Sequence, residues 1–124
     1  MAARAPRPGS PVRGSESGRP VMAALDLLGR RWTLRILWEL SQSPAGFREL
    51  QRRCERMSSS VLSTRLGELT DARVLTLHED AYHLTRLGED LIGALGPLTA
   101  WSRRWAEEMR TDTAGDGQAA EAKS

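Results

Sequence analysis

Apolar residues recur at intervals of three and four positions through most of the chain from residue 20 to residue 110, with polar residues between them. This spacing places the apolar side chains on one face of a helix. It predicts helices over residues 20–28, 30–40, 47–57 and 58–69. Because the second helix is apolar on two sides, we expect it to be buried on both. The apolar stripes are Val21, Leu25 and Leu28; Trp32, Ile36 and Leu40, with Leu34 and Trp38 on the second side; Phe47, Leu50, Cys54 and Met57; and Leu62, Leu66 and Leu69.

Two short runs of β-type residues, 74–78 and 82–85, follow the fourth helix. They predict a hairpin around the tip Glu79–Asp80–Ala81. A last helix is then expected from Thr85, its N-cap, to Arg110, kinked or broken at Gly96–Pro97. Its apolar stripe consists of Leu87, Leu91, Leu95, Leu98, Trp101, Trp105 and Met109.

The stripe of the last helix is long for a domain with so small a core. We expect this helix to pair with its symmetry mate in a homodimer, with help from the first helix; packing against its own domain is the alternative. The expected interface residues are Val21, Leu25, Leu91, Leu95, Leu98, Trp101 and Trp105. Leu34, Trp38, Trp101 and Trp105 either line a ligand cavity near this interface or simply fill the space there.

The order of helix, helix, helix, helix, hairpin and helix predicts a mainly α fold with a small β-hairpin (α+β). This is a winged helix-turn-helix with a C-terminal dimerisation helix. Residues 1–19 are rich in Pro, Gly, Ser and Arg and predict a disordered basic N-terminal arm. Residues 111–124 predict a disordered C-terminal tail, which leaves residues 20–110 as the folded domain.

Composition narrows the expected location of the protein. The single Cys54 excludes an internal disulfide and suits a reducing cytosol. No apolar run approaches 18 residues, and the N-terminus lacks the apolar stretch of a secretory signal. A cytoplasmic protein is expected, and the Arg- and Ala-rich usage fits a bacterium of high GC content.

The fourth helix, within "MSSSVLSTRLGEL", is unusual because its outer face carries hydroxyl groups and little charge. Small hydroxyl side chains let a helix backbone approach a DNA major groove closely and bond phosphates or base edges. The alternative is a helix cap and an ordinary solvated surface. The candidate base-reading residues are Ser59, Ser60, Ser63, Thr64 and Arg65.

Positive charge collects in the same part of the chain. Residues 30–65 contain eight arginines and three glutamates, whereas residues 66–110 contain five arginines and eight acidic residues. Such a concentration suits binding to DNA phosphates, although ordinary solvated charge is the alternative. Arg35 lies between apolar faces and is expected to be structural. The candidate phosphate-binding residues are Arg30, Arg31, Arg48, Arg52, Arg53 and Ser58.

Four segments, "LDLLGRRWTLRILWEL", "FRELQRR", "SSSVLSTRLGELTDARVL" and "YHLTRLGEDL", together resemble the HxlR-type transcriptional regulators, relatives of the MarR group. The resemblance covers residues 20–105. It implies a homodimer joined through the first and last helices that binds a two-fold related operator in double-stranded DNA. In some members it implies control by a small molecule or by redox chemistry.

Two features depart from this resemblance. Relatives often have a cysteine just before the first helix, where this chain has Arg19, and Cys54 lies on an inward stripe that suits an inert residue. The wing is short and acidic, so the arginines of residues 4–19 are candidates to replace it at the DNA. His78 and His83 are weak evidence for a metal, and no cofactor is expected.

Catalytic motifs are missing from the sequence. There is no Gly-rich phosphate loop, and the serines have no neighbouring His partner. The expected function is a DNA-binding transcriptional regulator rather than an enzyme, with a small-molecule effector as an additional hypothesis. The alternative is a winged-helix module that binds protein instead of DNA.

Overall fold

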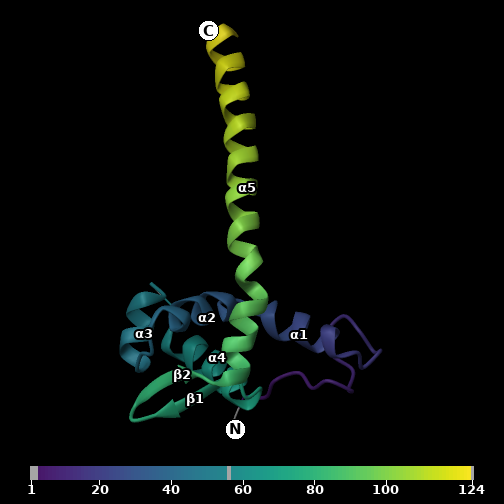
Figure 1. The fold of residues 1–124 in the computed structure, drawn as a ribbon, viewed down its shortest axis with the longest axis vertical. Helices are drawn as coiled ribbons and strands as arrows, with labels where there is room; N and C mark the ends of the chain where they lie inside the picture. Colours follow the sequence, from purple (N-terminus) through teal and green to yellow (C-terminus); the bar gives the residue numbers. More distant parts are fainter. Residues whose placement is uncertain (1–2, 56, 124) are drawn as a thin grey trace. The chain divides into compact units, whose positions relative to one another are not determined.

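The computed structural model describes residues 3–55 and 57–123, with side chains described as far as residue 112. Its elements follow the order predicted for a winged helix-turn-helix (Figure 1). Two compact units, Met1–Ile92 and Gly93–Ser124, divide the chain. The elements are α1 (Pro20–Leu28), α2 (Thr33–Gln42), α3 (Phe47–Arg53), α4 (Ser59–Asp71), β1 (Leu75–His78), β2 (Ala81–Leu84) and α5 (Arg86–Lys123).

Local sequence signals set several of the helix ends. Pro20 occupies the first turn of α1, where its missing N–H is no loss. The Ser58 hydroxyl accepts the Val61 N–H at 3.2 Å and so caps α4. The Thr85 hydroxyl accepts the Gly88 N–H at 3.0 Å and caps α5. Both caps agree with the prediction from the sequence.

The core of the first unit collects one apolar face from each of α2, α3 and α4, together with the start of β1. Ile36, Leu37, Leu50 and Cys54 are fully buried, as are the leucines at 62 and 69. Within this single chain, α2 is buried on one side, because Leu34 and Trp38 of its second stripe are 41% and 52% exposed. The second stripe of α2 therefore lies on the surface.

The wing is a tight antiparallel hairpin in which Leu75 pairs with Leu84 and His78 pairs with Ala81. Glu79 and Asp80 have φ values of 51° and 62°, as a two-residue type I′ turn requires. Ala45 extends the hairpin by exchanging two backbone hydrogen bonds with Tyr82, at 2.8 and 3.3 Å. The tip is thus as short and as acidic as the sequence predicted.

A close backbone approach joins the hairpin to α5. A side-chain carbon at Gly88 would lie 2.1 Å from the Val74 carbonyl oxygen, so only glycine fits there. The Thr85 N–H donates to that same oxygen at 3.0 Å, and the Thr85 hydroxyl donates to the Arg73 carbonyl at 2.7 Å. The start of α5 is therefore fixed to the base of the wing.

The terminal segments, for which composition predicted a disordered arm and tail, are described in part by the structure. Residues 3–7 lie against α4, where Ala5 is only 6% exposed, because small side chains and a salt bridge to Asp71 offset their low hydrophobicity. Residues 111–123 continue α5. Pro97 lies inside α5 instead of ending it. Met1, Ala2 and Ser124 lie outside the described residues. In the described part of the chain, no helix is long and apolar enough to span a membrane.

Candidate nucleic-acid interface

The hydroxyl-bearing face of α4 is open to solvent. Ser59, Ser60, Ser63 and Thr64 are all exposed, whereas the leucines on the opposite face of α4 are buried. The Gln51 amide on α3 donates to the Ser59 hydroxyl at 3.0 Å and to the Met57 carbonyl at 3.1 Å. These two hydrogen bonds connect α3 to the start of α4 and so fix the turn between the two helices.

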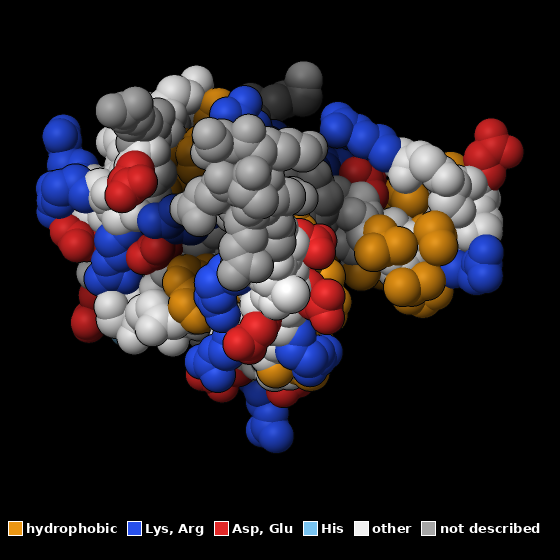
Figure 2. Space-filling model, turned by 90° about the horizontal axis from the view of Figure 1, so that it is seen from above, with side chains coloured by type: hydrophobic (Ala, Val, Ile, Leu, Met, Phe, Trp, Pro, Cys, Tyr) orange, Lys and Arg blue, Asp and Glu red, His pale blue; other side chains and the backbone are white. Residues whose placement is uncertain are grey.

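Basic side chains gather over α3, at the left of the view in Figure 2. Arg48 and Arg52 are exposed, and Arg52 pairs with Glu49 in the same helix, which lowers the pKa of that carboxyl. Arg53 donates to the Ser43 carbonyl at 2.8 Å and is 22% exposed, so it closes the α2–α3 turn. Arg56 lies outside the described residues.

The predicted phosphate contact at Arg30 requires a correction. Its side chain is 13% exposed and forms salt bridges with Asp26 of α1, at 3.4 Å, and with Glu68 of α4. With two carboxylates beside it, this guanidinium has little exposed surface left for a phosphate. Arg30 instead joins α1 to α4, and its neighbour Arg31 is the exposed residue, with its guanidinium 5.4 Å from the Trp32 ring centre.

Arg65 is also held by its own chain. It donates to the Arg31 carbonyl at 2.7 Å and pairs with Glu68 at 2.7 Å, and its side chain is 21% exposed. Desolvation, and then the nearby Arg30, lower the pKa of Arg65. Asp26, Arg30, Arg65 and Glu68 thus form a partly buried ion cluster, which we call the α1–α4 ion cluster.

Two other predicted roles have clear positions. The Ser58 hydroxyl is engaged as the α4 cap, although the residue is exposed. Arg35 is structural, as expected: it pairs with Glu39 at 2.8 Å, which raises its pKa, and it donates to the Arg53 carbonyl at 2.8 Å. It therefore ties α2 to the end of α3.

The residues predicted to form a dimer interface are mostly exposed within each unit. In the first unit, Val21 and Leu25 on α1 are 53% and 57% exposed, and Leu91 is partly buried. In the second unit, Leu95 is partly buried and Leu98 is exposed. Trp101 and Trp105 stack on each other with ring centres 5.5 Å apart, and both are about half exposed.

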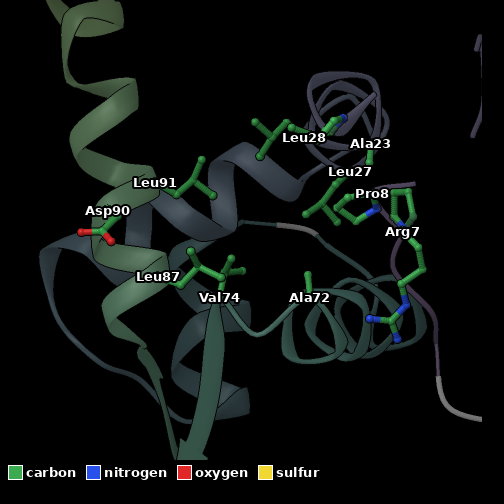
Figure 3. A pocket seen from close by; sticks show the side chains of 13 residues that line it. Arg7, Pro8, Ala23, Leu27, Leu28, Ala72, Val74, Leu87, Asp90 and Leu91 are labelled. Atoms are coloured by element: carbon green, nitrogen blue, oxygen red, sulfur yellow. The ribbon is translucent and has the colours of Figure 1, made fainter. Parts of the chain in front are cut away.

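An apolar cavity of about 440 Å³ lies in the first unit (Figure 3). Leu27 and Leu28 of α1 line one side, and Val74, Leu87 and Leu91 line the other. The polar groups of Arg7 and Asp90 point away from its centre (Figure 3). Leu34, Trp38, Trp101 and Trp105, predicted to line or fill a space near a dimer interface, are exposed in the single chain and do not line this cavity.

The remaining candidate chemistry is sparse. Cys54 is fully buried, and burial raises the pKa of its thiol, which keeps it protonated and unreactive at neutral pH. The His78 and His83 rings are 6.2 Å apart. Within residues 3–55 and 57–123, no group of three metal-ligating side chains comes together.

The helical order, the hairpin and the open fourth helix define a winged helix-turn-helix protein. A family model described as HxlR-like helix-turn-helix matches residues 27–110. The chain belongs to this family of helix-turn-helix transcriptional regulators, which are not enzymes. The resemblance found in the sequence motifs is thereby confirmed.

Individual relatives agree with this assignment. The chain is 31% identical over 96 residues to YvaP of Bacillus subtilis, an uncharacterized HTH-type transcriptional regulator, covering 72% of this chain and 89% of YvaP. The structure of quinone-bound YodB from B. subtilis has a TM-score of 0.64 and 28% identity, covering 68% of this chain and 96% of YodB. A structure described as a MarR-family regulator from Enterococcus faecalis shares the fold, with a TM-score of 0.65 and 24% identity, over 80% and 96% of the two chains.

Proposed function

We propose that this protein is a sequence-specific, DNA-binding transcriptional regulator that acts as a cytoplasmic homodimer on a two-fold related operator. The exposed hydroxyl face of α4 carries the proposal. In a transcriptional regulator, a helix whose exposed face has only small, uncharged side chains can enter a DNA major groove. Ser59, Ser60, Ser63 and Thr64 contact base edges and nearby phosphates.

The structure divides the arginines into two groups for this role. Arg31, Arg48 and Arg52 are exposed and bind phosphates beside the groove. Arg53 and Ser58 fix the turns on either side of α3, and Arg65 holds α4 in place through Glu68. We therefore assign base reading to the hydroxyl groups and not to Arg65.

The dimer is proposed on the exposed apolar residues of α1 and α5. The half-exposed leucine and tryptophan side chains of these helices are stabilised when they pack against the same residues of a second protein chain. A dimer would set two α4 helices about 34 Å apart, one turn of DNA. Sedimentation measurements on the protein and on a Trp101→Glu, Trp105→Glu variant test this: a dimer that the variant abolishes is expected, and a wild-type monomer contradicts it.

Selection of bound sequences from random duplex DNA tests the function directly. A two-fold motif is expected, with an affinity that falls steeply with salt, on the order of 10³-fold or more between about 50 and 200 mM for 6–10 phosphate contacts. Arg52→Gln should weaken binding to all sequences alike, whereas Ser63→Ala should relax base preference. Binding that is absent, or independent of salt, favours the alternative of a protein-binding module.

Control by a ligand is the second part of the proposal, and it rests on the apolar cavity of the first unit. A cavity of about 440 Å³ lined by leucine and alanine side chains suits a flat, apolar ring compound. One structural relative, YodB, has been solved with a bound quinone. With menadione as the probe, we expect a higher melting temperature and weaker DNA binding. An Ala24→Phe variant, which fills the cavity, should bind DNA normally and lose the response to menadione.

A further inference from the structure

Residues 3–7, which belong to no helix or strand, are fixed along the C-terminal half of α4, and we call them the N-terminal strap. The Asp71 carboxylate holds it at two points: it accepts the Ala5 N–H at 2.8 Å and the Arg7 guanidinium at 2.8 and 2.9 Å. The Arg30 guanidinium adds a third point by donating to the Arg4 carbonyl at 3.3 Å. The strap is thus bonded to the ion cluster and to α4 together.

Gly67 provides the seat of the strap. A side-chain carbon at Gly67 would lie 3.1 Å from the Ala3 methyl carbon, closer than most such contacts. Gly67 follows Ser60 by seven residues and Ser63 by four, so it continues the hydroxyl face of α4. Because Gly67 has no side chain, the strap can pack against the C-terminal end of the hydroxyl face of α4. The N-terminal end of that face stays exposed to solvent.

The exposure of the strap residues shows where Arg4 lies. Ala3 faces Gly67 and Ala5 is buried, whereas Arg4 between them is open to solvent. Arg4 is exposed, and among the described residues only its backbone carbonyl takes part in a hydrogen bond. Arg7, by contrast, is neutralised by Asp71. Among the described residues, Arg4 forms no salt bridge, so the strap presents its guanidinium to solvent at this end of α4.

We propose that the N-terminal strap is a second DNA-contacting element, in which Arg4 binds a backbone phosphate next to the groove that α4 enters. This inference rests on the proposed function and adds a contact outside the helix-turn-helix itself. The acidic tip of the wing, Glu79–Asp80, repels phosphates, so the strap supplies a basic contact that the wing does not.

The first test removes the charge and keeps the fold. Arg4→Gln retains the backbone carbonyl that Arg30 bonds, so the strap stays in place. We expect affinity for the selected duplex to fall about 5- to 10-fold at about 100 mM salt. The slope of log affinity against log salt should become shallower by about 1 for each phosphate that the variant no longer neutralises. Arg86→Gln, which removes the same charge at the exposed start of α5, is the matched control and should change affinity by less than about 2-fold.

The second test separates a seated strap from simple charge attraction. Asp71→Asn removes a negative charge, which by itself favours DNA binding, but it also loosens the strap. We expect weaker binding by Asp71→Asn and unchanged or slightly tighter binding by Asp90→Asn, the control with the same change of charge. Thermal melting of each variant checks that the domain remains folded at the temperature of the assay.

Three results would overturn the inference. Equal decreases in affinity for Arg4→Gln and Arg86→Gln would show a diffuse charge effect, and an unchanged affinity of Arg4→Gln would show that Arg4 does not touch the DNA. Tighter binding by Asp71→Asn than by Asp90→Asn would mean that the strap obstructs DNA. If the wild-type protein itself fails to bind any duplex, the proposed function fails and the strap contact fails with it; in the other three cases the proposed function stands.

Discussion

The two halves of α4 have opposite relations to the rest of the molecule. The N-terminal half, from Ser59 to Thr64, keeps its polar side chains in solvent. The C-terminal half places Glu68, only 5% exposed, between two guanidinium groups and seats the strap at Gly67 and Asp71. One helix is thus anchored at one end and available for binding at the other, so stability and recognition can be altered separately.

The largest expected effect is on the anchored half. Glu68→Gln leaves Arg30 and Arg65 close together without the carboxylate that both share, and breaking a buried charge pair costs about 3–5 kcal/mol. We expect the free energy of unfolding, measured in urea, to fall by about 3 kcal/mol. Glu49→Gln, in the exposed pair with Arg52, should change it by less than about 1 kcal/mol. If Glu68→Gln left the free energy of unfolding unchanged, the ion cluster would not anchor the C-terminal half of α4.

The next effect concerns the open half. Ser63→Glu sets a negative charge where we place DNA phosphates and bases, and affinity should fall by at least about 10-fold. Because Ser63 is exposed, the free energy of unfolding should change by no more than about 0.5 kcal/mol. Gln42→Glu adds the same charge at the end of α2 and serves as the control. An equal decrease of affinity in both variants would place the DNA contact elsewhere.

A smaller effect is expected at the boundary where α4 begins. Ser58→Ala removes the hydroxyl that accepts the Val61 N–H, and loss of such a cap costs about 1 kcal/mol. Ser60→Ala, two residues later on the exposed face, should be close to neutral in thermal melting. If Ser60→Ala destabilises the protein as much as Ser58→Ala does, the cap does not explain the stability of this end.

The smallest effect is the pH dependence of the strap. The Ala5 N–H, and then Arg7, hold the pKa of Asp71 below its ordinary value of 3.8. The Asp71 pKa is therefore lower in the folded state than in the unfolded state. The strap's contribution to stability is complete above the unfolded-state pKa and disappears as the pH falls through the folded-state pKa. NMR titration of Asp71 should show this, and Arg7→Gln should raise the Asp71 pKa without restoring it fully. An identical pKa in both proteins would exclude the ion pair.

Much of the fold can be predicted, because the information is local. The stripes Leu62–Leu66–Leu69 and Phe47–Leu50–Cys54 identify buried helix faces, and Ser58 and Thr85 identify helix starts. The termini are harder. Composition does not reveal that Ala3 fits Gly67 or that Arg7 reaches an aspartate 64 residues away.

The candidate site is predicted less completely, for a related reason. Helical spacing predicts an exposed Ser63 and Thr64, and the structure places them there. The same spacing cannot separate a free arginine from a paired one, so it assigns Arg30 to phosphates although Glu68 encloses it. Asp26 and Arg30 are four residues apart in the sequence, and Arg65 and Glu68 are three apart. That these two pairs contact each other depends on how α1 packs against α4 in the tertiary structure.

The joint at Thr85 has a mechanical consequence. Two hydrogen bonds from Thr85, the cap residue of α5, and the close approach of Gly88 to the Val74 carbonyl link the first turn of α5 to the base of the wing. A torque applied to that turn is therefore transmitted to the hairpin instead of being absorbed in a loop.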